Sequence, residues 1–486
     1  ANAAVSAFDA TQVGALTATQ MRALTTTQLN ALTTADVAEL STAQIAALST
    51  TQARGLSTTR IADLLDTQVA ALAATQLTAL TSTSLNSFAD TQIAALTTTQ
   101  IAALTTAQVT ALNATNVGAL TETQVGALTA SQVTALTTTN LATFGATQLG
   151  VLSTTQVRAF SITQVAAFGA TQLAALDATQ AASLTTAQVR ALTATQIGAL
   201  DATDIAEFSQ TQLASLTNTQ VGALTATSVT ALAATQIAAL TATQVGRLTT
   251  AALGALDATQ SAALTTTQIG GLSTTQIAAL DATDVGDLTT TQLAALTTQQ
   301  VQALTSTNMA SLNATQVAAF AVTQLQALST TNLNALDAAQ TAALTTTQVA
   351  GLTTTQVAGL ATTDIGELGA AQVAALTATQ VSRLATDALS ALDQTQAAAL
   401  TTTQVRALTT TQLAALQSTD VAELSTTQLR ELNVTQVQAL TSTNLALLAD
   451  TQVAALTTTQ VAALSTTNLS AFGDPQIGAL TTTQIA

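Results

Sequence analysis

The chain has 486 residues, with no Cys, His, Trp, Tyr or Lys, a single Pro and only 7% charged residues. Eight Phe and no other aromatic residue are too few for several conventional cores, whereas 48% apolar residues is more than a disordered chain contains. The net charge of −16 argues against a nucleic-acid partner, and no run of about eighteen apolar residues is present to cross a membrane.

An eight-residue repeat runs through the whole chain. Every residue whose number is a multiple of eight is Leu or Phe, from Phe8 to Leu480, and no insertion or deletion breaks this register. We call each unit an octad and number its positions slot one to slot eight, with the Leu or Phe in slot eight. A typical octad is residues 97–104, TTTQIAAL. The unbroken register predicts one continuous repeat domain over residues 1–486, without a linker.

The residue types within each octad predict a short capped helix. Slot one is Thr, Ser, Asp, Asn or Gly in 51 of 61 occurrences, which is the preferred set for a helix N-cap. Slot four is usually Gln, which completes a capping box with slot one. Slots five and eight are large and apolar, three residues apart, so they mark one buried face. Where slot one is Leu65, Ala89 or Ala449, an Asp follows, which predicts that the cap moves by one residue.

The placement of charge also favours helices. Eighteen of the 25 acidic residues lie in slots one to four, and eight of the nine Arg lie in slots six or seven, which is the polarity that a helix dipole prefers. Pro475 occupies a first-turn position, where its missing N–H costs nothing. A two-turn helix is not stable alone, so the octads must stack on one another. We therefore predict an all-α solenoid, a superhelix of very short capped helices with one helix per octad.

Slot four indicates the pitch of this superhelix. Departures from Gln recur every 24 residues, as at Asp36, Arg60 and Ser84, which predicts three octads per 24-residue turn. Duplication is the other explanation, because residues 249–336 resemble residues 385–472. The alternative fold is a three-sided β-solenoid with 24 residues per coil, because Thr and Val suit strands. That fold leaves the caps and the charge polarity unexplained.

The chain offers little catalytic chemistry. His, Cys, Lys and Tyr are absent, so nothing is available to activate the many hydroxyl groups, and we expect neither an enzyme nor a bound cofactor. One local motif stands out, in which an Asp in slot four is followed by an acid in slot seven. Two carboxylates three residues apart on a helix are candidate Ca²⁺ ligands. The five pairs are Asp36 and Glu39, Asp204 and Glu207, Asp284 and Asp287, Asp364 and Glu367, and Asp420 and Glu423.

Simpler roles are open to these pairs. They would also fit a solvated edge of the solenoid, or ion pairs with a cation one coil away, as Arg60 would form with Asp36. Calcium binding and a purely structural role both remain open from the sequence.

The Thr/Ala-rich octads resemble the repeat regions of large bacterial surface and secreted structural proteins, including giant adhesins and subunits of extracellular filaments or sheaths. The similarity covers nearly the whole chain and is one of composition. It implies an extracellular or cell-surface location on a bacterium and a structural role.

Neither end of the sequence carries a polar capping repeat of the kind that normally terminates a solenoid. Ala1 begins an ordinary octad and Ala486 stands in mid-octad. This predicts either adjoining chain or head-to-tail association with other copies into a homopolymer, as in a filament, sheath or rigid surface scaffold. The alternatives are a spacer stalk of a giant secreted adhesin and a calcium-stabilised binding scaffold.

Overall fold

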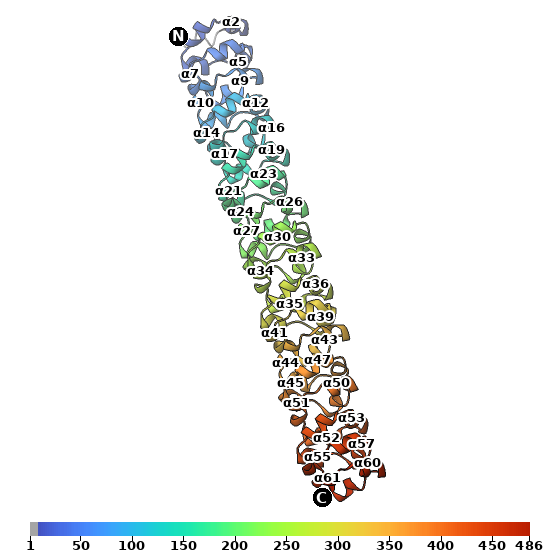
Figure 1. Cartoon of the computed structure of the whole chain (residues 1–486). Coiled ribbons are helices and arrows are strands. Elements are labelled where there is room, and N and C mark those ends of the chain that lie inside the picture. Colours follow the sequence, from blue (N-terminus) through green and yellow to red (C-terminus); the bar gives the residue numbers. More distant parts are fainter. Residues whose placement is uncertain (1–7) are drawn as a thin grey trace. The chain divides into compact units, whose positions relative to one another are not determined.

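Short α-helices make up the computed structural model, which describes residues 8–486 (Figure 1). Helices α2 to α61 belong to octads two to 61. Each begins at slot two and ends at slot five, six or seven, as in α2 (Ala10–Gly14), α13 (Thr98–Ala103) and α61 (Thr482–Ile485). Residues 8–486 contain no strand. The predicted all-α solenoid with one helix per octad is confirmed, and the three-sided β-solenoid is wrong.

The octad at residues 97–104 shows how these short helices begin and end. The hydroxyl of Thr97 accepts a hydrogen bond from the backbone N–H of Gln100 at 3.2 Å, and the Gln100 side-chain oxygen accepts one from the Thr97 N–H at 2.7 Å. This is the predicted capping box, and it satisfies two N–H groups that the helix leaves unpaired. Leu104 then returns to extended backbone, φ −52° and ψ 136°, so the chain turns without a glycine. No residue from 8 to 486 has a positive φ.

One prediction about the caps is wrong. Leu65 remains the N-cap of α9 (Asp66–Ala71), and Ala89 and Ala449 likewise remain N-caps, so the cap does not move onto the following Asp. The reason is that the Gln half of the box still operates. The Leu65 N–H donates to the Gln68 side-chain oxygen at 2.8 Å, which holds the helix start in register without a slot-one acceptor.

The chain divides into two compact units, residues Ala1–Leu240 and Thr241–Ala486, and each is described by itself. In the first unit, α10 (Ala74–Ala79) packs against α7 (Thr50–Gly55) and against α13. In the second, α40 (Ala314–Ala318) packs against α43 (Ala338–Ala343). Within each unit a helix therefore meets the helix three octads further along, which confirms three octads per 24-residue coil. A single continuous domain over residues 1–486 stays a prediction.

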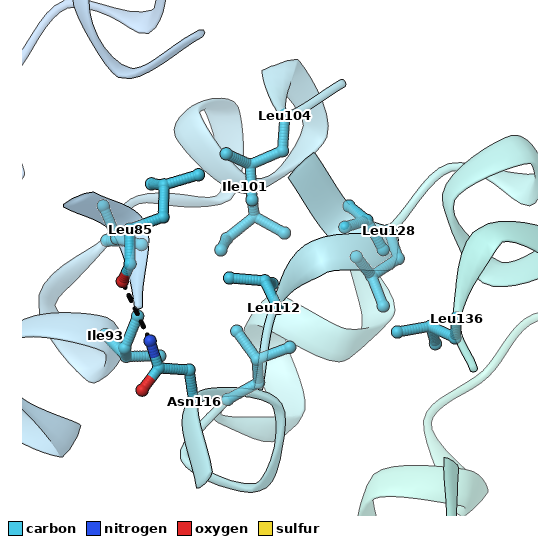
Figure 2. A pocket seen from close by; sticks show the side chains of 11 residues that line it. Leu85, Ile93, Ile101, Leu104, Leu112, Asn116, Leu128 and Leu136 are labelled. Atoms are coloured by element: carbon cyan, nitrogen blue, oxygen red, sulfur yellow. Dashed lines mark hydrogen bonds between the residues drawn. The ribbon is translucent and has the colours of Figure 1, made fainter. Parts of the chain in front are cut away.

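Slots five and eight form the interior of each coil, as predicted. In the first unit, the side chains of Leu85, Ile93, Ile101 and Leu112 point toward one another in the centre (Figure 2). Ile101 is 1% exposed, and most slot-five side chains are completely buried. Burial of a side chain of this size stabilises the fold by about 1.5–3 kcal/mol. An apolar interior therefore runs through the stacked coils of each unit.

Candidate functional site

The repeated contact between successive coils depends on the slot-four Gln. Gln100 is 3% exposed, and its side-chain nitrogen donates to the backbone oxygens of Val69 at 2.9 Å and Leu72 at 2.8 Å. These two carbonyls lie at the C-terminal end of α9, in the coil before. One amide thus caps the start of its own helix through its oxygen and the end of another helix through its nitrogen. Backbone groups that burial would leave unpaired are satisfied in this way.

This second role of Gln was not predicted. From the sequence alone, the capping box is the only role that we assigned to the slot-four Gln. A Glu side chain would provide the same accepting oxygen for that box. Glu nevertheless occurs in no slot four of the chain. The absence of Glu indicated that the side-chain N–H groups are needed, because Glu is as long as Gln and lacks only these donors.

Several polar side chains in slot six supply a second contact between coils. Thr110 donates to the backbone oxygen of Ala135 at 3.0 Å, Asn86 donates to that of Ala111 at 2.8 Å, and Gln326 donates to that of Gly351 at 2.7 Å. Each donor reaches 25 residues ahead, into slot seven of the next coil. Residue type varies widely in slot six, and these polar side chains join one coil to the next.

The predicted acidic pairs lie where this Gln contact is missing. In all five octads the slot-four carboxylate keeps the acceptor role of Gln at its own helix start. Asp36 accepts from the Thr33 N–H at 2.7 Å, and Asp420 accepts from the Gln417 N–H at 2.9 Å. The helices concerned are α5 (Thr34–Glu39), α26 (Ala202–Ala206), α36 (Ala282–Gly286), α46 (Thr362–Gly366) and α53 (Ser418–Ala422).

A third carboxylate accompanies each pair, and the sequence analysis missed it. A slot-one Asp occurs 27 residues before the slot-four Asp in all five cases, one coil earlier. These residues are Asp9, Asp177, Asp257, Asp337 and Asp393. The only other slot-one Asp residues, Asp201 and Asp281, cap two of the acidic octads themselves. The signal was available, but it appears only when residues one coil apart are compared.

The crowding of carboxylates changes their acidity. Burial raises the pKa of Glu207, and the negative charges of Asp204, Asp177 and Asp201 raise it further. Burial likewise raises the pKa of Glu423, with Asp420 and Asp393 adding to the effect. A raised pKa means that the ionised form is disfavoured at these positions.

The pKa values of two slot-four carboxyls are raised as well. Burial raises the pKa of Asp284, although the hydrogen bond from the Asp281 backbone opposes this shift. Burial also raises the pKa of Asp364, which is 6% exposed. Beside it, one carboxylate oxygen of Glu367 is buried without a hydrogen-bond partner. Among residues 8–486, no group of three or more acidic side chains converges closely enough to hold a metal ion. Calcium binding at the five pairs stays a prediction.

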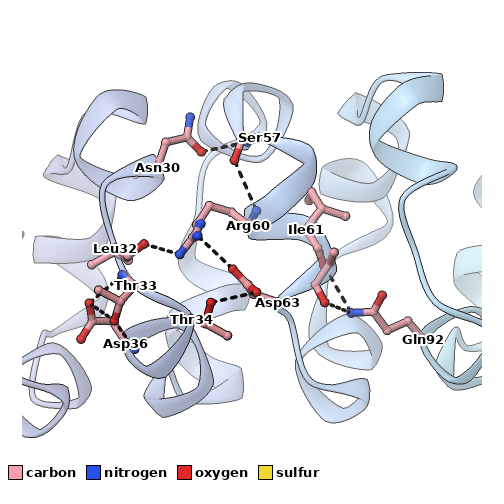
Figure 3. Close-up of polar contacts among 11 residues, drawn as sticks. Asn30, Leu32, Thr33, Thr34, Asp36, Ser57, Arg60, Ile61, Asp63 and Gln92 are labelled. Atoms are coloured by element: carbon pink, nitrogen blue, oxygen red, sulfur yellow. Dashed lines mark hydrogen bonds and ion pairs between the residues drawn. The ribbon is translucent and has the colours of Figure 1, made fainter.

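The expected ion pair between Arg60 and Asp36 does not form. Arg60 instead pairs with Asp63 on its own octad at 3.2 Å, and its guanidinium donates to the Leu32 backbone oxygen (Figure 3). Asp63 also accepts from the Thr34 hydroxyl at 3.1 Å, while Asp36 turns back onto Thr33. Arg60 therefore occupies the slot-four position and reaches the preceding coil as Gln does, by donating to a slot-eight carbonyl.

Comparison with known families agrees with this organisation. The ALTTAQ repeat matches the chain in five places, at residues 29–66, 277–314, 317–354, 413–450 and 453–486. The chain is a tandem-repeat protein. No curated protein matches it at a significant level. In the described part of the chain, no helix has the length and apolar character needed to span a membrane.

Proposed function

We propose that this repeat protein is a non-catalytic structural element that builds an extracellular filament, sheath or rigid surface scaffold by end-to-end association of its solenoids. The observation that carries the proposal is the bridging contact of Gln100 and its equivalents. Each coil offers amide donors on one face and carbonyl acceptors on the other. Any coil without a neighbour on one side presents the groups that another copy of the chain would pair with.

Apolar side chains would add to such a contact. Slot-five side chains are completely buried in most octads because the next coil covers them. Ile477 and Ile485 have no following coil in the described residues, and they are 44% and 67% exposed. Covering them with the first coil of a second copy would bury two large side chains, at about 1.5–3 kcal/mol each. A head-to-tail contact of this kind continues into an open filament unless its rotation closes a ring.

The location and the partner follow from the same reasoning. The partners we propose are other copies of the chain, in a homopolymer, and not nucleic acid. Net negative charge opposes side-by-side association, and salt screens this repulsion over about 8 Å. The resemblance to repeat regions of bacterial surface and secreted proteins supports a place outside the cell or at its surface. A spacer stalk of a giant adhesin is the alternative, in which a single solenoid acts alone.

Light scattering and electron microscopy across a concentration series test the proposal. Gln20 is exposed, and its side-chain oxygen accepts from the Thr17 N–H at 2.8 Å. Gln20→Glu keeps that cap but replaces the outward amide with a carboxylate, which repels the carbonyls of an incoming copy. Gln210→Glu introduces the same charge in an exposed slot two and serves as the control.

We expect wild type and Gln210→Glu to form linear assemblies. Gln20→Glu should form shorter assemblies or remain unassembled. A chain that stays monomeric at high concentration and in high salt would refute end-to-end assembly and favour the single-chain stalk.

A further inference from the structure

A side chain shorter than Gln can still donate from slot four to the preceding coil. Asn140 donates to the Leu112 backbone oxygen at 3.0 Å, Asn332 to that of Leu304 at 2.7 Å, and Asn444 to that of Leu416 at 3.0 Å. In each case the acceptor is the slot-eight carbonyl 28 residues earlier. Asn and Asp have the same length and shape, so a side chain of this size reaches the preceding coil.

Asp in this slot reaches the same seam but cannot make the bond while it is ionised, because a carboxylate carries no proton to donate. One carboxylate oxygen of Asp284 lies 3.2 Å from the position where a Cβ on Gly254 would stand. Gly254 directly follows α32 (Thr250–Leu253), in the preceding coil. Asp284 therefore sits against the previous coil, with its acceptor bond from the Asp281 N–H at 3.0 Å intact.

Four of the five acidic octads also lie on loose seams. At these octads the helix makes sparser backbone contact with the helix one coil earlier than most helices elsewhere in the same unit do. The four pairs are α23 (Ala178–Ser183) with α26, α33 (Ala258–Ala263) with α36, α43 with α46, and α50 (Gln394–Ala399) with α53. The helices α2 and α5, at the fifth acidic octad, pack closely. The Asp36 octad therefore differs from the other four on the side of the preceding coil, although α5 makes sparse contact with α8 (Thr58–Ala62) in the following coil.

The interior is also altered beneath these four seams. Slot five is small or polar in the chain at only five octads, and four of these are on the loose seams. The four residues are Ala181, Ser261, Thr341 and Ala397. A cavity of about 20 Å³ lies beside Thr341 and Asp364, and another of about 20 Å³ lies beside Ala397, Asp420 and Glu423. Each has room for about one water molecule. The seams are thus built differently from the rest of the array in both backbone spacing and core.

We propose that Asp284 and Asp364, each in slot four, link their own coil to the preceding coil when they are protonated. When such a carboxyl is ionised, it has no proton to donate to the preceding coil. When it takes up a proton, its O–H donates to the slot-eight carbonyl of the preceding coil, as the amide of Asn does. Protonation also removes one of the negative charges that crowd the seam. Acidification therefore tightens the array at two defined places.

The groups near the two carboxyls act in opposite directions. Burial and the charges of Asp281 and Asp287 raise the pKa of Asp284, and a hydrogen bond from the Asp281 backbone lowers it. Burial raises the pKa of Asp364, and hydrogen bonds from the Ala361 backbone and the Thr363 side chain lower it. The other acidic residues on the same octad, in slot one of the preceding coil or on the helix packed one coil later are Asp257 for Asp284, and Asp337, Glu367 and Asp387 for Asp364. The cation closest in sequence to either carboxyl is Arg383, which is exposed.

The direction of the pH effect follows from the shifted acidities. Burial raises the pKa values of Asp284 and Asp364 in the folded chain. A raised carboxyl pKa means that the folded state binds more protons than the unfolded state between the two pKa values. The stabilisation is fully present below the ordinary carboxyl pKa of about 4 and is lost as the pH rises through the raised values.

The test is amide hydrogen exchange of the full chain at about pH 4 and about pH 7.5, in the presence of a chelator and corrected for the intrinsic rate at each pH. In wild type we expect protection in α36 and α46 to be about fivefold lower at the higher pH, which corresponds to one lost hydrogen bond per seam. Protection in α13, whose slot four is Gln, should not change.

A combined variant with Asp284→Asn and Asp364→Asn should keep the high protection at both pH values, because Asn donates at any pH. Asp36→Asn is the matched control, at an acidic octad that packs closely on the preceding coil, and should leave the pH dependence as in wild type. The proposal is overturned if the combined variant loses protection with pH as wild type does, or if α13 responds as strongly as α36 and α46. It is also overturned if the combined variant is less protected than wild type at the higher pH.

Discussion

Replacing one interior Gln by Glu tests the central contact of the fold. Gln100→Glu keeps the side-chain length and the oxygen that accepts from the Thr97 N–H at 2.7 Å. It removes the donor to the Val69 and Leu72 carbonyls. Two lost hydrogen bonds cost about 2 kcal/mol, and a carboxylate at a site only 3% exposed adds about 1–3 kcal/mol. We expect the seam between α9 and α13 to lose about 3–5 kcal/mol.

Hydrogen exchange measures this loss better than global unfolding does, because long repeat arrays do not unfold as one unit. Protection in α9 and α13 should fall by at least about a hundredfold at neutral pH. Part of it should return at about pH 4, where the introduced carboxyl group is protonated and can donate again. Gln210→Glu, with the same charge on an exposed helix start, should change protection little. If Gln100→Glu leaves both helices as protected as in wild type, the amide bridge does not hold the coils together.

Other predictions concern the core, the caps and the acidic octads. Leu256→Asp places an unpaired carboxylate at a site 6% exposed and should cost several kcal/mol of local stability measured by hydrogen exchange, whereas Arg190→Ala on the exposed face should cost under about 0.5 kcal/mol. Thr97→Ala should cost about 1 kcal/mol in the same assay by removing one half of a capping box. Calorimetric titration with Ca²⁺ should show binding that Glu207→Gln weakens if the acidic pairs are cation ligands, and no heat in either protein would reject that hypothesis.

Much of the fold could be predicted because the residue types within each octad determine its local structure. The capping box of Thr97 and Gln100 and the buried Leu104 follow from residue type and spacing alone. The contacts between coils could not be predicted so easily, since they join residues 25 to 31 positions apart. The amide of Gln100 and the Asp residues one coil before each acidic pair belong to this class. The Arg60 ion pair was wrongly assigned because Asp63, on the same octad, competes for the cation more closely than Asp36 does.

The three-octad coil sets a rule for how such a chain can change length. Gain or loss of about 24 residues leaves every side of the coil in phase, so all bridges between coils find their usual partners. Gain or loss of a single octad keeps each helix intact but moves every later octad to the next side. In the second unit, Asp284 and Asp364 are 80 residues apart, which is three coils and one octad, and Asp364 and Asp420 are 56 apart, which is two coils and one octad. Each acidic seam in this unit therefore lies on the next side of the coil from the seam before it. Duplication of a single octad would move all later acidic seams to another side.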